Sequence, residues 1–214
     1  MNKILFELRV ATNIFKFDYI FQRKKKFRNS LYKNGLKLLF DKSINFEIYD
    51  VDFIFVDNTV SSQKKIDSEI LDILPSNVLV QTIKRNNYGK KNYGAGDIDV
   101  WRYNKDIIQN YEYFFHYEPR IQVFNKNFIK DFLEYPCNYF SHDQTNYQFN
   151  TGYFGIRTVE LIKFINSVDL DNMVINKISI EKMLYDYFVD KEYKEFKGKY
   201  GFRFDDYTNS FELY

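Results

Sequence analysis

The sequence contains a single cysteine, Cys137, which excludes an intramolecular disulfide and a cysteine-rich zinc module. It also lacks any run approaching the roughly 18 apolar residues of a membrane-spanning helix. Charged residues interrupt every apolar run within residues 1 to 21, so no signal-peptide pattern is present. A lone cysteine fits a reducing compartment. We therefore expect a cytoplasmic protein with no membrane span.

The chain also lacks a large net charge of either sign. The formal net charge is +2, which argues against a nucleic-acid binder that relies on bulk positive charge. No internal repeat, linker or low-complexity tract divides the 214 residues, and a chain of this length can bury one sizeable core. We therefore expect a single domain covering residues 1–214. Aromatic residues make up 20% of the chain, which favours a well-packed and partly β protein.

The first 120 residues alternate between strand and helix patterns. Short apolar runs predict strands, and longer runs with apolar residues at helical spacing predict helices. The expected strands are 4–12, the part of 46–59 around 51–56, 78–83 and 111–118, and the expected helices are 22–40, 66–74 and 97–110. This alternation predicts an α/β fold with a mostly parallel central sheet flanked by helices.

The stretch YEYFFHYEPR, residues 111–120, predicts the central strand, which ends at Pro119 because proline cannot donate to a sheet ladder. The end of this strand presents His116, Glu118 and Arg120. His116 and Glu118 are two apart and share one face, so together they can hold a divalent metal such as Mn²⁺ or Mg²⁺. The alternative is a core histidine beside a solvated glutamate.

The other predicted strands of this half also end in polar residues. Because the carboxyl ends of parallel strands meet at one edge, and ligands bind there in open α/β sheets, we expect a single site. The residues expected at this site, besides those above, are Thr12, Asn13, Asp57, Asn58, Asn86 and Asn87. Gly94 to Gly96, read as the end of a loop before a helix, are expected to let backbone N–H groups approach phosphate.

The second half is less regular. Its expected helices are 127–134, 158–167 and 179–188, the last capped by Ser179. Residues 149–157 predict a strand with two glycines, which often mark the close approach of a ligand. Residues 201–214 predict an edge strand.

The order of these elements resembles GT-A glycosyltransferases, the nucleotide-diphospho-sugar transferase fold, most strongly over residues 48–157. IFVDNT resembles that family's second strand, where an aspartate, here Asp57, helps to bind the nucleoside. RNNYGKKNYGAG resembles its loop before a helix, which implies donor binding by residues such as Gly94. FNTGYFGIR resembles the strand lining the acceptor pocket, which implies acceptor-side roles for Asn150 and Gly152.

The resemblance implies transfer of a sugar from a nucleotide-diphosphate sugar to a hydroxyl of a glycan or glycoprotein acceptor. SIEKML lies where inverting members often carry an acidic residue at a helix start, so Glu181 is the first candidate for the base and Asp143 the second. Residues 1–120 would then form the nucleotide-binding half and residues 121–214 the acceptor-side half.

One departure from the family concerns the metal. His116-Tyr117-Glu118 stands where the family has Asp-x-Asp, so either this pair binds the metal, or Arg120 and nearby lysines neutralise the diphosphate instead. A literal Asp-x-Asp occurs at Asp97 and Asp99. We do not assign the metal to it, because residues two apart in a helix point in different directions, and acidic residues opening a helix simply offset its dipole.

Two other function classes stay open from the sequence. A sugar nucleotidyltransferase would carry a Gly- and Lys-rich loop after the first strand, where this chain has TNIFKFDYIFQ. The missing Asp-x-Asp also allows a non-catalytic module that binds a glycan, a protein or single-stranded nucleic acid. No Gly-Lys-Ser/Thr follows the glycines, which argues against a P-loop kinase or ATPase.

Overall fold

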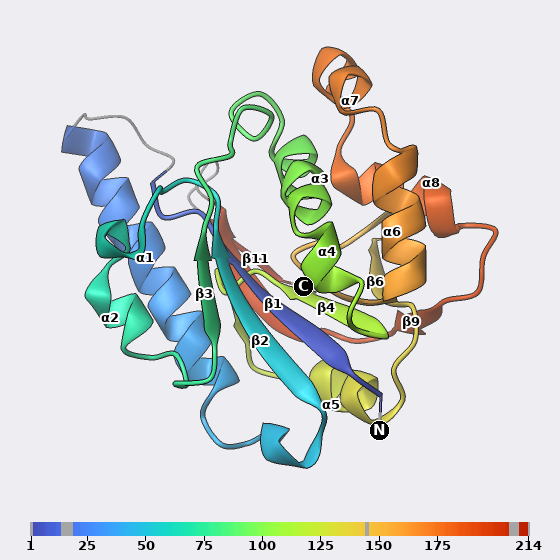
Figure 1. The fold of residues 1–214 in the computed structure, drawn as a ribbon, viewed down its shortest axis with the longest axis horizontal. Coiled ribbons are helices and arrows are strands. Elements are labelled where there is room, and N and C mark those ends of the chain that lie inside the picture. The colour runs from blue at the N-terminus through green and yellow to red at the C-terminus, as the bar shows by residue number, and fades with distance from the viewer. Residues whose placement is uncertain (1, 14–18, 144–145, 206–209, 214) are drawn as a thin grey trace.

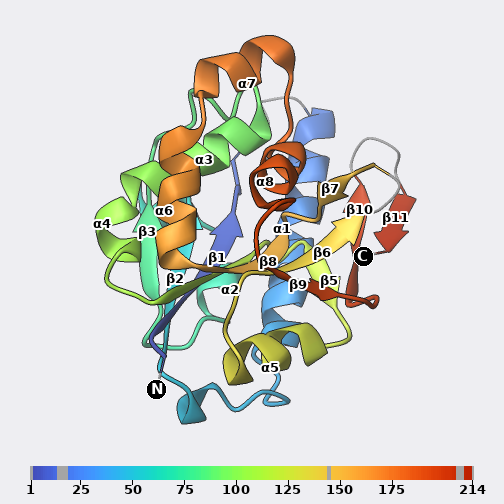
Figure 2. The same ribbon diagram turned by 90° about the vertical axis from the view of Figure 1, so that its right-hand side faces the viewer.

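The computed structural model describes residues 2–13, 19–143, 146–205 and 210–213. Its main sheet is mixed and mostly parallel, and helices flank both faces (Figures 1 and 2). In spatial order its strands are β3 (Leu79–Thr82), β2 (Val51–Asp57), β1 (Ile4–Val10), β4 (Tyr113–Tyr117), β8 (Tyr153–Arg157) and β6 (Tyr139–Asp143), and β6 also pairs with β7 (Gln148–Phe149) and β9 (Lys194–Phe196).

The α/β architecture predicted from the sequence is therefore confirmed. Strands β3, β2, β1 and β4 are parallel, whereas β8 runs antiparallel to both β4 and β6. All seven residues of β1 are buried, as expected for a strand covered on both faces.

Helices divide between the two faces. Alternate residues of β1, beginning with Ile4 and Phe6, pack against α1 (Tyr19–Leu39), α2 (Ser68–Leu71) and α5 (Asn127–Glu134). Leu5, on the opposite face, belongs to a second core cluster. The helices of that cluster are α3 (Tyr93–Tyr103), α4 (Lys105–Ile108), α6 (Thr158–Ser167), α7 (Leu170–Asn176) and α8 (Ile180–Phe188). Short 3₁₀ turns occupy Phe46–Ile48 and Gln63–Lys65.

Many of the aromatic side chains pack within these two cores. Phe6 and Phe115, on neighbouring strands, stack with ring centroids 4.5 Å apart, and Phe128 stacks on Tyr139 at 4.2 Å. Each buried aromatic ring removes a large apolar area from water and favours such offset or edge contacts. This packing agrees with the well-packed, partly β protein expected from the composition.

One prediction about the second half is wrong in detail, and another, the edge strand expected from residues 201–214, holds for a second sheet. Residues 149–157 do not form one strand, because a turn at residues 151 and 152 separates β7 from β8. The segment from 201 onward does not extend the main sheet. It forms β10 (Gly201–Asp205) and β11 (Ser210–Leu213), which pair with β5 (Ile121–Val123) in a second sheet.

Gly35 explains how α1 approaches the end of β4. A Cβ atom at this position would lie 1.8 Å from the backbone oxygen of Pro119 and 3.0 Å from the hydroxyl of Tyr117. The glycine that weakens α1 as an isolated helix therefore lets the helix pack against the segment that follows β4.

Replacing Gly35 with Ala is expected to lower the free energy of unfolding by about 1–3 kcal/mol, because the added methyl overpacks a backbone contact. Helix propensity alone predicts the opposite sign, a gain of roughly 1 kcal/mol. Urea unfolding measures the difference, with Asn34→Ala, an exposed position on the same helix, as the control for propensity. A Gly35→Ala protein as stable as the wild type would contradict the close packing.

Candidate functional site at the carboxyl edge of the sheet

The carboxyl ends of β3, β2, β1 and β4 lie along one edge of the sheet, and antiparallel β8 begins there. We call this the carboxyl edge. The chain places β2 and β3 on one side of β1 and β4 on the other, so the strand order reverses between β1 and β4. Ligands of open α/β sheets bind at such a reversal. The residues predicted from strand ends therefore lie where a ligand is expected.

Asp57 joins the loops that follow β1 and β2. Its carboxylate is fully buried and accepts hydrogen bonds from the backbone N–H of Thr12 (3.1 Å) and of Thr59 (2.8 Å), and from the hydroxyls of both threonines. The Thr59 hydroxyl oxygen in turn accepts from the backbone N–H of Asn13 (2.9 Å). Because both carboxylate oxygens are engaged, Asp57 shapes the edge by fixing these two loops, and its contact with a nucleoside stays a prediction.

The loop after β3 folds back toward the same edge. Buried Asn58 donates through Nδ2 to the side-chain oxygen of Asn86 (3.3 Å) and more weakly to the backbone oxygen of Arg85 (3.5 Å). Asn87 is exposed. The structure thus brings Asn58 and Asn86 together and leaves Asn87 at the surface.

Gly94 lies inside the first turn of α3, so the prediction of a glycine loop before this helix is wrong. Asn92 caps the helix by accepting from the N–H of Ala95 (3.0 Å). A Cβ atom on Gly94 would lie 2.6 Å from Cβ of Ile180. Position 94 therefore needs a residue without a side chain, because α3 packs closely on the start of α8. Nucleotide binding by Gly94 stays a prediction.

His116 and Glu118 are each engaged by other protein groups. The Nδ1 atom of His116 lies 2.6 Å from a carboxylate oxygen of Glu7. Oε1 of Glu118 accepts from Nε of Arg120 at 2.5 Å and lies 3.9 Å from Nη2 of Arg28. Within the described ranges, no three His, Cys, Asp or Glu side chains are grouped so as to hold a metal ion. The predicted pair therefore does not fit a metal centre, because two arginines already surround its carboxylate.

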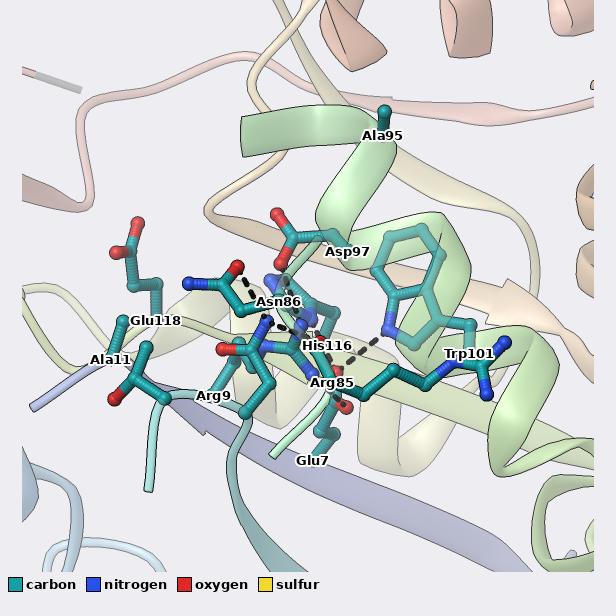
Figure 3. Close-up of polar contacts among 12 residues, drawn as sticks. Glu7, Arg9, Ala11, Arg85, Asn86, Ala95, Asp97, Trp101, His116 and Glu118 are labelled. Carbon is teal, nitrogen blue, oxygen red and sulfur yellow. Dashed lines mark hydrogen bonds and ion pairs between the residues drawn. The ribbon is translucent and has the colours of Figure 1, made fainter. Parts of the chain in front are cut away.

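Glu7 was not expected to contribute to the site. It lies in β1 directly beside His116 in the strand register and is almost completely buried. The indole N–H of Trp101 donates to its Oε2 atom (2.9 Å), the same atom that His116 contacts. Figure 3 shows these side chains converging on Glu7 between β1 and α3. The available signal was the pair of charges, Glu7 and Arg9, inside an otherwise apolar strand.

Burial alone would raise the pKa of Glu7. The hydrogen bond and charge of His116, the charge of Arg9 and the hydrogen bond from Trp101 outweigh burial, so the pKa is lowered below its ordinary value of 4.5. Glu7 is therefore held as a carboxylate within the protein interior.

Asp97 and Asp99 point in different directions, as predicted. Asp97 pairs with Arg9 (2.9 Å), while Asp99 accepts from Nε of Arg85 through both oxygens (3.0 Å each). The assumed dipole role is wrong, because α3 begins at Tyr93 and its first turn carries no acidic residue. Each aspartate instead holds an arginine from a neighbouring segment.

The acceptor-side residues meet the end of β4. The backbone N–H of Glu118 donates to the oxygen of Gly152 (2.8 Å), and the preceding residue, Thr151, donates its hydroxyl to Glu181 (2.9 Å). Asn150 contacts the hydroxyl of Ser141 through Nδ2 (3.1 Å). The structure thus brings Gly152 and Glu181 to the carboxyl edge.

Asp143 ends β6, which runs parallel to β4, so its backbone also reaches the carboxyl edge. Its side chain lies outside the described part of the structure. A role for Asp143 as a base therefore stays a prediction.

Two surface cavities lie away from this edge. One, of about 480 Å³, is lined by charged residues at the far end of β8 and on α6, including Arg157, Glu160 and Lys163, and the other, of about 540 Å³, adjoins Tyr111. Neither contains a predicted site residue. In the first cavity, Lys163 (2.9 Å) and Lys191 (3.7 Å) both pair with Glu160. The carboxyl edge differs in gathering charged side chains that are almost completely buried, such as Glu7 and Arg9. Buried ionisable groups cluster at functional sites, so the edge is the better candidate.

Comparison with known protein families and with curated proteins finds no match to this chain. Among the described residues, no helix has the length and apolar character needed to cross a membrane.

The pH dependence of stability tests the Glu7 network. Because its pKa is lowered on folding, Glu7 contributes stability above pH 4.5, and this contribution is lost as the pH falls through the folded-state pKa. Replacing Glu7 with Gln is expected to reduce the free energy of unfolding at neutral pH by about 1–3 kcal/mol. Urea unfolding of both proteins between neutral pH and about pH 3 should show this difference shrinking. A difference independent of pH would contradict an ionised Glu7.

Proposed function

We propose that the protein is a glycosyltransferase of GT-A-like fold that moves a sugar from a nucleotide-diphosphate sugar to a hydroxyl of a glycan or glycoprotein acceptor. One observation carries this proposal: residues predicted for the donor side and for the acceptor side meet at the carboxyl edge. Glu118, at the end of β4, hydrogen-bonds to Gly152, and the adjoining Thr151 hydrogen-bonds to Glu181. A transferase needs such proximity, because donor and acceptor must react within one site.

The sheet supports the same proposal. Its parallel half, β3-β2-β1-β4, has the strand-order reversal at which nucleotides bind in α/β proteins. The segment FNTGYFGIR continues the sheet beside β4 through β8, so the expected acceptor strand adjoins the expected donor strand.

Arginine side chains would neutralise the diphosphate leaving group. Arg120 and Arg28 both lie beside Glu118, and their guanidinium groups are largely buried. A guanidinium binds two phosphate oxygens at once and keeps its charge at any physiological pH. Glu118 would hold Arg120 in place before the donor binds and compete with phosphate for it.

Glu181 would accept the acceptor proton. As the bond between the acceptor oxygen and the anomeric carbon forms, the bond to the diphosphate breaks, and the hydroxyl proton moves to the carboxylate. Thr151 orients that carboxylate through Oε1, and among the described residues nothing hydrogen-bonds to Oε2. Attack from the side opposite the leaving group would invert the anomeric centre.

Arg120→Ala is expected to weaken binding of UDP or GDP roughly tenfold or more, because a charge-assisted contact to phosphate is lost. Glu118→Ala is expected to retain or tighten binding, because a competing carboxylate is removed. Calorimetric titration measures both, with and without Mn²⁺ and EDTA.

Lys130→Ala, an exposed position on α5, makes the same charge change as Arg120→Ala away from the site and serves as the control. Loss of Mn²⁺-dependent binding in the Glu118 variant would show that the carboxylate holds a metal after all. A wild-type protein that binds neither nucleotide nor nucleotide-sugar would rule out the proposed function.

Glu181→Gln is expected to reduce sugar transfer by roughly 10²–10⁴-fold, the range for loss of a general base, while nucleotide binding stays unchanged. Transfer from a bound nucleotide-sugar, followed as nucleotide release in the presence of an acceptor, measures this effect. Glu69→Gln removes another glutamate from a helix's first turn and controls for the helix dipole. Equal transfer by the Glu181 variant and the wild type would exclude Glu181 as the base. Nucleotide binding without any wild-type transfer would favour a non-catalytic module.

A further inference from the structure

Asp97 is a partly exposed carboxylate at the point where the strand order reverses. Its side chain is 32% exposed, and Arg9 occupies only Oδ1 (2.9 Å). Within the described segments, no hydrogen bond reaches Oδ2. Figure 3 shows Asp97 on the same side of the sheet as Glu118 and Asn86. Asp97 therefore offers one unused acceptor atom beside the residues expected to contact a ligand.

Arg9, which pairs with Asp97, is itself positioned by Glu7. Arg9 is almost completely buried, and its Nη1 atom lies 3.7 Å from Oε1 of Glu7. Glu7 is fixed by Trp101 and His116, as described above. Replacing a buried set of charges with well-packed apolar residues often leaves a protein equally stable. Stability alone therefore does not explain why Glu7, Arg9 and His116 are buried here. The position of Asp97 at the surface is a feature that these charges do determine.

The surroundings of Asp97 favour a neutral ligand group over an anionic one. Burial by neighbouring atoms raises the pKa of Asp97, the charges of Glu118 and Glu7 add to this increase, and those of Arg9 and His116 oppose it. A phosphate placed against Oδ2 would meet the negative charge of Asp97 itself, with those of Glu118 and Glu7 nearby. A hydroxyl group would donate a hydrogen bond without adding charge.

We propose that Asp97 selects the sugar of the donor, with Oδ2 accepting a hydrogen bond from a hydroxyl of the glycosyl group and Arg9 acting as a positioning residue backed by Glu7. This proposal rests on the proposed function and adds to it the group through which the sugar, as distinct from the nucleotide, is recognised. The diphosphate would lie nearer Arg120, which pairs with Glu118.

The test compares Asp97→Asn with Asp99→Asn. The two aspartates are two positions apart in α3, and each pairs with an arginine. They differ in that Asp99 pairs with Arg85 and is nearly buried. Each protein is titrated calorimetrically with UDP and GDP and with UDP-glucose and GDP-mannose. Thermal unfolding establishes that each variant is folded, and Asp97→Ser, a smaller polar substitution, is the second variant at this position.

Asp97→Asn is expected to bind the free nucleotides within about twofold of the wild type and to bind the preferred nucleotide-sugar roughly tenfold more weakly, because a charge-assisted hydrogen bond to the sugar is lost. Asp99→Asn should bind both classes as the wild type does. Deoxy analogues of the preferred sugar then identify the hydroxyl: the analogue lacking it should bind equally to wild type and Asp97→Asn.

Three results would overturn the inference. If Asp97→Asn binds the nucleotide-sugar as tightly as the wild type, Asp97 does not recognise the sugar, although the proposed function stands. If binding of free nucleotide and nucleotide-sugar falls equally, Asp97 acts on the nucleotide portion instead. If the wild-type protein binds none of the four probes, the proposed function fails, and the inference fails with it.

Discussion

A carboxylate buried between two parallel strands and a helix sets the arrangement of the candidate site. Glu7 on β1 contacts His116 on β4 at 2.6 Å and Trp101 on α3 at 2.9 Å, so one residue links all three elements. An unpaired carboxylate in this apolar interior would be strongly destabilising. The three elements must therefore adopt the register and separation that satisfy Glu7, and this places Arg9 and Asp97 at the carboxyl edge.

The same constraint separates the two faces of the sheet in chemical character. The face toward α1 is apolar along the whole of β1, with Phe6 stacked on Phe115. The face toward α3 is apolar near Leu5 and becomes charged at Glu7 and Arg9 as the strand approaches the carboxyl edge. Polarity thus increases along one face in the direction in which a ligand is expected, while the other face retains an uninterrupted hydrophobic core.

Local sequence patterns predicted the fold better than the site. The apolar runs of β1, β2 and β4 and the helical spacing of α5 and α6 identify those elements, because burial dictates their residue types. The bond between Glu7 and His116 joins positions that no local pattern relates, since strand pairing decides it. The role of Gly94 was missed for a similar reason, because its close neighbour, Ile180, comes from a distant helix. Polar strand ends indicated which residues would share one edge of the sheet, but not which side chains fix its loops.

The second sheet gives the segment after β4 a late partner during synthesis. Strand β5 follows the candidate site at once, yet Ile121 pairs with Arg203 of β10, which leaves the ribosome only after α5 to α8 have been made. Until then the backbone of β5 lacks this ladder, although its neighbours in β4 can already pair with β1. Before residue 201 is made, the turn containing Pro119 and Arg120 can pack only against segments already synthesised, such as α1 at Gly35, and the ladder between β5 and β10 is added last.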